Sequence, residues 1–225
     1  NLGAPQLGVR GAALATLIAR LLVVTIVAGH MARTRFFRVR PGLLLRPGVD
    51  MVRRFLRYGG LVVCNETMWG IGTSVFPTIM GHMEGSTEIL AAYTVAGNVE
   101  KLCTVFSFGL AATASVIIGR EIGAGRSDRV ESMGLAMDTL AVGCGLTLGV
   151  LLMGFARLIA PDWVFPLFKL SPGASAVAGM MLTVMACYMP LRAFNSVNIV
   201  GVLRGGGDVR MATLIDTSPL WVCAI

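Results

Sequence analysis

The chain has 225 residues, of which 55% are hydrophobic and only 14% are charged, and its mean hydropathy is +0.76. This composition excludes an ordinary soluble domain and indicates a membrane protein made almost entirely of helices. The net charge of +7 does not indicate nucleic-acid binding, because eight arginines crowd residues 33–57 in and beside one connection between apolar segments, as in the cytoplasmic loops of membrane proteins.

The first apolar segment lies within residues 1–32 and carries Arg20 near its middle. The arginine-rich connection follows at 33–54, holds two Pro-Gly pairs, and is expected to be the only interdomain linker. Its run of leucines at 43–45 would suit a short helix on the inner membrane surface. The chain begins with Asn1 and stops inside an apolar run, so we expect it to be a piece of a longer protein.

Residues 55–225 predict further membrane helices, each near or above the roughly 20 residues that a bilayer requires. Their expected ranges are 55–83, 87–119, 130–160, 174–204 and 209–225, the last of them truncated. The connections alternate in charge: Arg120, Arg126 and Arg204 fall on the side of the basic linker, and Glu84 and Glu88 fall on the other. All loops therefore agree with one orientation, with the basic linker in the cytoplasm.

The most informative polar residue is Glu66, which lies inside the apolar segment 55–83. An intramembrane carboxylate is costly and commonly marks a proton or ion site. We therefore interpret Glu66 as a cation-coupling residue that takes up a proton or binds Na⁺. The alternative is a structural carboxylate that pairs with a neighbouring helix, for instance with Arg192 or Lys101.

Other polar or aromatic residues of the apolar segments are candidates for the wall of a cavity. Arg192, Asn195 and Asn198 recur every third residue, which would place them on one helix face. The alternative is interhelical hydrogen bonding that only holds a bundle together. The full set of cavity and substrate candidates is Asn65, Trp69, Glu100, Lys101, Arg192, Asn195, Asn198 and Asp216.

The chain lacks the signatures of catalysis and of metal binding. It has two distant histidines, no H-E-x-x-H motif and no serine-centred elbow. Its five cysteines fall one per predicted helix without a C-x-x-C pair, and we expect them to be small buried hydrophobic residues. No catalytic residue, certain metal site or cofactor is therefore expected.

Three motifs occur in order: Asn65-Glu66-Thr67-Met68-Trp69-Gly70, the glycine-rich end of the segment 91–125, and Gly201-Val202-Leu203-Arg204-Gly205-Gly206-Gly207-Asp208. With them, the chain resembles the MATE (multi-antimicrobial extrusion) transporters of the bacterial NorM/DinF-like branch. The resemblance implies about half of a twelve-helix, two-lobe all-α membrane protein. Residues 1–32 would be the last helix of the N-terminal lobe, 33–54 the interlobe loop, and 55–225 the C-terminal lobe.

The resemblance also implies a function: a secondary active antiporter, not an enzyme, that exports organic cations and drugs in exchange for H⁺ or Na⁺. Glu66 matches the cation-binding glutamate of this branch. Where the branch carries a second acidic residue, this chain has Ala193, so coupling would rest on Glu66 or on carboxylates of the first lobe. The implied location is the bacterial inner membrane, with a monomeric full-length protein in contact with lipid and with small cationic substrates.

Two other functions remain open from the sequence. A lipid-linked saccharide flippase of the same superfamily would need cavity cations for phosphate groups, and Arg20, Lys101 and Arg192 would supply them. A membrane scaffold without transport activity would have no need for an isolated intramembrane carboxylate such as Glu66.

Overall fold

The computed structural model describes residues 8–33 and 48–224 of the chain. The chain divides into two compact units, Asn1–Arg53 and Arg54–Ile225, and each is described by itself. The first unit contains α1 (Gly8–Arg33), one helix with almost all of its described side chains exposed. The predicted surface helix at 43–45 and most of the predicted interlobe loop lie outside the described residues.

The helix α3 (Val49–Gly81) begins earlier than the expected residue 55, so the last part of the predicted loop is helical. The Gly48 carbonyl accepts hydrogen bonds from the amides of Met51 and Val52, at 3.0 and 3.1 Å. Asp50 lies in the first turn, where its charge favours the positive end of the helix dipole. These local interactions let the helix begin inside the arginine-rich segment despite its repelling charges.

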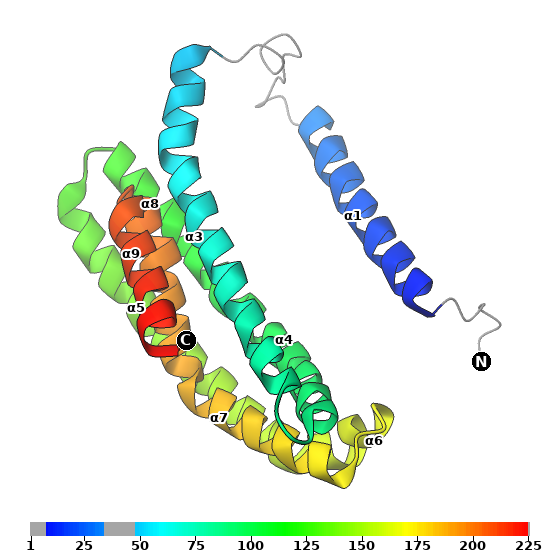
Figure 1. The fold of residues 1–225 in the computed structure, drawn as a ribbon. Helices are drawn as coiled ribbons and strands as arrows, with labels where there is room; N and C mark the ends of the chain where they lie inside the picture. Colours follow the sequence, from blue (N-terminus) through cyan, green and yellow to red (C-terminus); the bar gives the residue numbers. More distant parts are fainter. Residues whose placement is uncertain (1–7, 34–47, 225) are drawn as a thin grey trace. The chain divides into compact units, whose positions relative to one another are not determined.

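Three long helical stretches form the body of the second unit (Figure 1). The first is α4 (Ser86–Gly123). The second runs without a break through α5 (Ser127–Gly154), the π-helical segment η1 (Phe155–Val164) and α6 (Phe165–Leu167). The third joins α7 (Pro172–Ser196), the π-helical segment η2 (Val197–Leu203) and α8 (Arg204–Gly206), and is followed by α9 (Val209–Pro219) and η3 (Leu220–Ala224).

The second unit places its basic and acidic connections at opposite ends. The N-terminal part of α3, the α4–α5 turn and the α8–α9 turn lie at one end, and the α3–α4 turn lies with α6 at the other (Figure 1). At the first end, the Arg126 side chain forms an ion pair with Glu121 at 2.7 Å. This hydrogen-bonded pairing raises the pKa of the Arg126 guanidinium.

Small residues form most of the core where α4, α5 and α7 meet. The buried hydrophobic residues include many alanines, among them Ala92, Ala96, Ala141, Ala178, Ala186 and Ala193. A Cβ at Gly145 would lie 2.6 Å from the Cα of Pro190, and one at Gly201 would lie 2.8 Å from the Cβ of Ala114. The helices thus approach backbone to backbone, as in membrane proteins, where close van der Waals packing replaces the hydrophobic effect.

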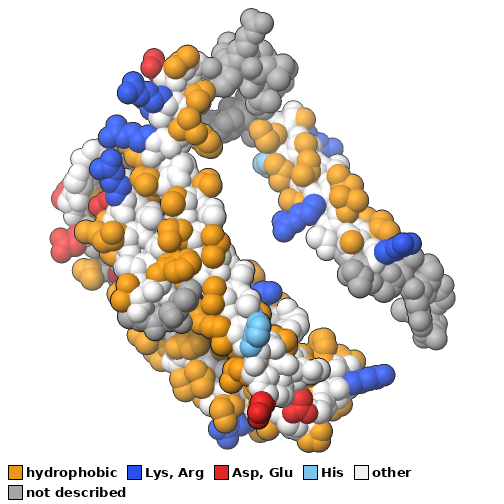
Figure 2. Space-filling model, in the orientation of Figure 1, with side chains coloured by type: hydrophobic (Ala, Val, Ile, Leu, Met, Phe, Trp, Pro, Cys, Tyr) orange, Lys and Arg blue, Asp and Glu red, His pale blue; other side chains and the backbone are white. Residues whose placement is uncertain are grey.

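Large apolar side chains point outward along the unit. Figure 2 shows hydrophobic side chains over most of the visible face, with Lys and Arg gathered where α3 begins. Four stretches of the described ranges are long and apolar enough to cross a membrane: Ala13–Arg33, Ser86–Gly123, Ser127–Leu167 and Pro172–Gly206. The described residues contain helices and turns and no strand. The predicted all-α fold class, a bundle of membrane helices, is therefore confirmed.

We predict that Gly145→Ala lowers the stability of the protein by about 1–3 kcal/mol, because the added methyl overlaps α7. Gly143→Ala is the matched control, since a Cβ at Gly143 meets nothing within 4 Å. The measurement is the thermal unfolding midpoint of the full-length protein in detergent. Equal midpoints for the two variants would contradict the close approach of α5 and α7.

Candidate functional site

A network of polar side chains joins α3 to α9 and is centred on Asn65. The Asn65 side chain is only 1% exposed. Its Nδ2 donates to Oδ2 of Asp216 at 2.7 Å, and its Oδ1 accepts a hydrogen bond from Oγ1 of Thr217 at 2.6 Å. One amide therefore satisfies a carboxylate and a hydroxyl of a helix more than 150 residues away in sequence, which fixes how α3 and α9 are paired.

Arg204 extends this network to Glu66. Its Nη1 donates to Oε1 of Glu66 at 2.9 Å and its Nη2 to Oδ2 of Asp216 at 3.4 Å. The Arg204 Nε is buried and has no hydrogen-bond partner among the residues that the structure describes. Glu66 thus pairs with a neighbouring helix, as the structural alternative expects, but its partner is Arg204 and not Arg192 or Lys101.

The burial of Glu66 also differs from the expectation. Its side chain is 60% exposed in this fold, while that of Arg204 is 16% exposed. The neighbouring Asn65 occupies the buried face of α3 instead, because adjacent residues on a helix point about 100° apart. The carboxylate of Glu66 is consequently accessible while it remains bound to the cluster.

We call Asn65, Glu66, Arg204, Asp216 and Thr217 the α3–α9 cluster. It contains two carboxylates and one guanidinium, so with all three groups ionised it carries one net negative charge. A proton or one monovalent cation would neutralise it. Carboxylate, amide and hydroxyl oxygens are also suitable ligands for a hard cation.

A second polar cluster lies between α4 and α7. The Oε1 of Glu100 accepts hydrogen bonds from the Tyr188 hydroxyl at 2.6 Å and from Nη1 of Arg192 at 2.7 Å. Glu100 is 16% exposed and Arg192 is 30% exposed. Glu100 on α4 thus pairs with Arg192 on α7, which balances its charge.

The expected polar face of Arg192, Asn195 and Asn198 is wrong as a single surface. Asn198 donates to Oδ1 of Asp138 on α5 at 2.8 Å, whereas Arg192 binds Glu100 on α4, and Asn195 is exposed. Six residues correspond to about 600° of helical rotation, which leaves Arg192 and Asn198 about 120° apart. They therefore meet different neighbouring helices.

The remaining predicted candidates stand apart from both clusters. Trp69 is 39% exposed on α3, and Lys101 is exposed on α4. Within residues 8–33 and 48–224, neither Lys101 nor Asn195 has a side-chain ion pair or hydrogen bond. The described residues also contain no group of three or more His, Cys, Asp or Glu that could hold a metal ion.

The expectation that the cysteines are buried is wrong for all four cysteines whose side chains the structure describes. Cys103 and Cys144 are half-buried, and Cys64 and Cys187 are exposed. Both exposed cysteines lie on long helices of the second unit. A cysteine on the surface of a membrane helix can face the lipid, because the lipid tails are as apolar as a protein interior.

Sequence reasoning missed Arg204, Thr217 and Tyr188 as members of the clusters. The sequence places Arg204 in a cytoplasmic turn, whereas the structure places it at the start of α8, the last part of the helical stretch that continues from α7. One signal in the sequence could have indicated Arg204. Glu66 and Asp216 lie at similar depths in their helices, and two carboxylates at one depth need a shared cation. The sequence alone does not identify which arginine supplies it.

Comparison with known proteins assigns the family. The MatE family model matches residues 60–225, which is most of the chain, and the chain therefore belongs to the MatE family. Among solved structures, no significant match was found.

Three curated relatives illustrate the similarity. A Thermotoga maritima protein named probable multidrug resistance protein NorM is 23% identical over 99% of this chain and 46% of its own length. A Deinococcus radiodurans protein of the same name is 29% identical over 98% of this chain and 48% of its own length. The uncharacterized transporter YisQ of Bacillus subtilis is 24% identical over 97% of this chain and 46% of its own length. The chain spans about half the length of the curated relatives that it matches.

Family membership and the apolar helices together define a multi-pass membrane protein of the MatE family. Its relatives are bacterial, which corresponds to the plasma membrane. The predicted family and location are therefore confirmed, whereas the division into lobe, loop and lobe stays a prediction.

We predict that Asn65→Ala destabilises the protein by about 1–3 kcal/mol, because Asp216 and Thr217 lose their buried partner. Thr67→Ala is the control on the same helix, since the Thr67 hydroxyl bonds only to the carbonyl of Val63 and is exposed. Thermal unfolding of the full-length protein measures both. A similar midpoint for both variants would contradict a stabilising role for the Asn65 network.

A double-mutant cycle tests the α4–α7 pair. Arg192→Gln should cost roughly 1–3 kcal/mol by stranding the Glu100 carboxylate, less than for a fully buried pair because Arg192 is 30% exposed. The double variant Glu100→Gln with Arg192→Gln should recover much of this loss. Additive losses in unfolding free energy would show that the two residues do not interact.

Proposed function

We propose that the chain is part of a secondary active antiporter that exports organic cations and drugs in exchange for H⁺ or Na⁺. Two observations support the proposal. The chain belongs to the MatE family, and several relatives carry the name multidrug resistance protein. The proposed transporter works as a monomer in the bilayer and uses the coupling ion without an organic cofactor.

The observation that carries the coupling mechanism is the unbalanced charge of the α3–α9 cluster. Glu66 is accessible and bound to Arg204, while Asp216 is held by Arg204 and Asn65. A proton or Na⁺ on Glu66 would compete with Arg204 for the carboxylate. Uptake of one cation would therefore weaken the attachment of α3 to Arg204 and to α9.

Competition for Glu66 can move α3, because this helix is attached to the rest of the unit by few buried residues. In α3 only Asn65 and Gly72 are buried, and large side chains such as Val63 and Ile71 are exposed. Few apolar contacts therefore oppose movement of this helix against the body of the unit. Coupling-ion binding shifts such an equilibrium only if the ion binds the two arrangements differently, and competition with Arg204 provides that difference.

The substrate would meet the exposed candidates near this cluster. Trp69 lies one helical turn from Glu66 on α3 and is 39% exposed, and its ring would attract an organic cation. Glu100 is less suited to bind a substrate directly, because Arg192 and Tyr188 already occupy its carboxylate. Asn195 and Lys101 remain candidates for the cavity wall because both are exposed.

We predict that Glu66→Gln abolishes ion-driven export, because the amide cannot exchange a proton or balance Na⁺. Cells that lack other drug pumps would express the full-length protein, and efflux of ethidium would be followed while the Na⁺ and H⁺ gradients are collapsed in turn. Loss of efflux in one of these two conditions identifies the coupling ion. Glu131→Gln is the matched control, since Glu131 is exposed on α5 and outside the cluster.

Efflux that Glu66→Gln leaves intact would contradict the coupling role. Retention of ethidium by the wild type in every condition, with the protein present in the membrane, would contradict export of organic cations. A flipping assay with a lipid-linked saccharide would then test the flippase alternative, for which Arg20 and Lys101 are both exposed, whereas Arg192 is paired with Glu100. Absence of both activities would leave a scaffold.

A further inference from the structure

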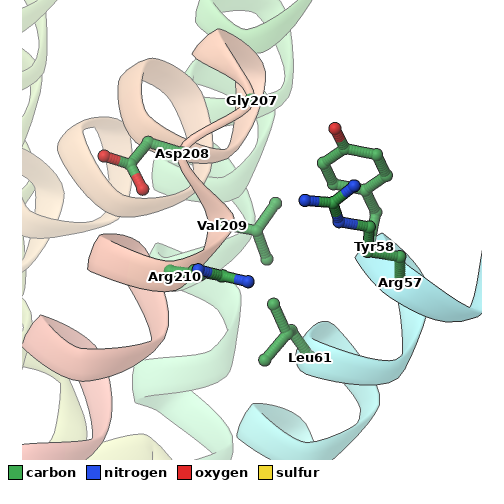
Figure 3. Close-up of a pocket in the computed structure, with 7 residues that line it drawn as sticks. All are labelled: Arg57, Tyr58, Leu61, Gly207, Asp208, Val209 and Arg210. Atoms are coloured by element: carbon green, nitrogen blue, oxygen red, sulfur yellow. The ribbon is translucent and has the colours of Figure 1, made fainter. Parts of the chain in front are cut away.

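A pocket lies between the N-terminal half of α3 and the α8–α9 turn. Figure 3 shows its lining, which consists of Arg57, Tyr58, Leu61, Gly207, Asp208, Val209 and Arg210. Gly207 has a φ of 92°, a left-handed conformation that turns the chain sharply into α9. The turn brings the start of α9 opposite the first exposed turns of α3.

Two cationic side chains face this pocket from different helices. The guanidinium of Arg210 extends from α9 toward α3, and that of Arg57 lies across from it beside Tyr58 (Figure 3). In the part of the chain that the structure describes, neither guanidinium forms an ion pair or hydrogen bond. Both are exposed.

The only acidic residue of the lining does not neutralise these arginines. The Asp208 side chain accepts a hydrogen bond from the Met211 amide at 3.1 Å and so caps α9. Its carboxylate points away from both guanidinium groups (Figure 3). The pocket thus presents two unneutralised positive charges toward one space, which is the arrangement that binds a phosphate group.

The surroundings of the pocket indicate where the phosphate comes from. Leu61 and the buried Val209 provide an apolar floor, and Leu56 and Val63 on α3 are 62% and 65% exposed. The α8–α9 turn, which contributes Gly207 and Asp208 to the pocket, lies at the end of the unit that holds the basic turns (Figure 1). The positive-inside rule places this end in the cytoplasm. Basic pockets between membrane helices on this side suit lipid headgroups, with acyl chains along the apolar helix surface.

We propose that this pocket binds the phosphate of an anionic membrane lipid, with Arg57 and Arg210 as the two cationic ligands and the exposed apolar side chains of α3 against its acyl chains. The site is separate from the α3–α9 cluster in its residues and its ligand. Lipid binding there would join α3 to α9 at the cytoplasmic end.

The test is lipid retention by the full-length protein in native mass spectrometry, with phosphatidylglycerol, phosphatidylcholine or inorganic phosphate added to the detergent solution. The wild type should retain phosphatidylglycerol in preference to phosphatidylcholine. Arg57→Gln with Arg210→Gln should weaken this retention roughly 30-fold, from about one kcal/mol for each arginine near the headgroup. Arg57→Lys with Arg210→Lys should keep part of the affinity for phosphatidylglycerol. This variant also controls for effects of the substitutions on folding.

Arg129→Gln with Arg54→Gln is the matched control, because it removes the same charge from the same end of the protein without touching the pocket lining. An equal loss of phosphatidylglycerol in this control would overturn the proposal in favour of general charge attraction. Equal retention of both lipids by the wild type would also overturn it. Inorganic phosphate that displaces phosphatidylglycerol at comparable concentration would assign the site to a soluble anion instead of a lipid.

Discussion

The hydrogen bonding of the Asn65 amide is the interaction on which the position of α3 depends. Asn65 is the single polar residue that α3 buries, and its partners Asp216 and Thr217 both lie on α9. In an apolar environment an unpaired amide or carboxylate costs free energy, so α3 and α9 must align to satisfy both. The alignment in turn brings Glu66 within reach of Arg204 and brings Arg57 opposite Arg210. The candidate coupling site and the proposed lipid site thus follow from one polar pairing.

The body of the unit is held by a different kind of interaction. The helices α4, α5 and α7 pack through alanine and glycine, so close that Gly145 and Gly201 have no room for a side chain. Such contacts are numerous and insensitive to charge. The contacts of α3, in contrast, rest on ionisable groups. A change in protonation or cation binding would therefore affect α3 while leaving the packed helices in place, which is the property required of a coupling element.

The two carboxylate clusters differ in charge balance. Glu100 has its own arginine and a tyrosine hydroxyl, so its cluster has no charge left to neutralise. Glu66 shares Arg204 with Asp216, so its cluster retains one negative charge. The unbalanced charge would favour binding of a cation at the Glu66 cluster, whereas the balanced pair of Glu100 and Arg192 forms a link between α4 and α7.

The sequence by itself determined the helical membrane fold, because hydropathy and helix length depend only on consecutive residues, and it determined the family through motifs such as Gly201 to Asp208. It also indicated Glu66 and Asp216 as unusual, since their cost follows from their place in an apolar segment. The tertiary structure alone decided which groups meet. The partner of Glu66 is Arg204, the buried neighbour is Asn65, and Arg192 faces away from Asn198. These outcomes depend on helix rotation and on contacts between residues 60 to 151 positions apart in the sequence. Neither composition nor local periodicity contains that information.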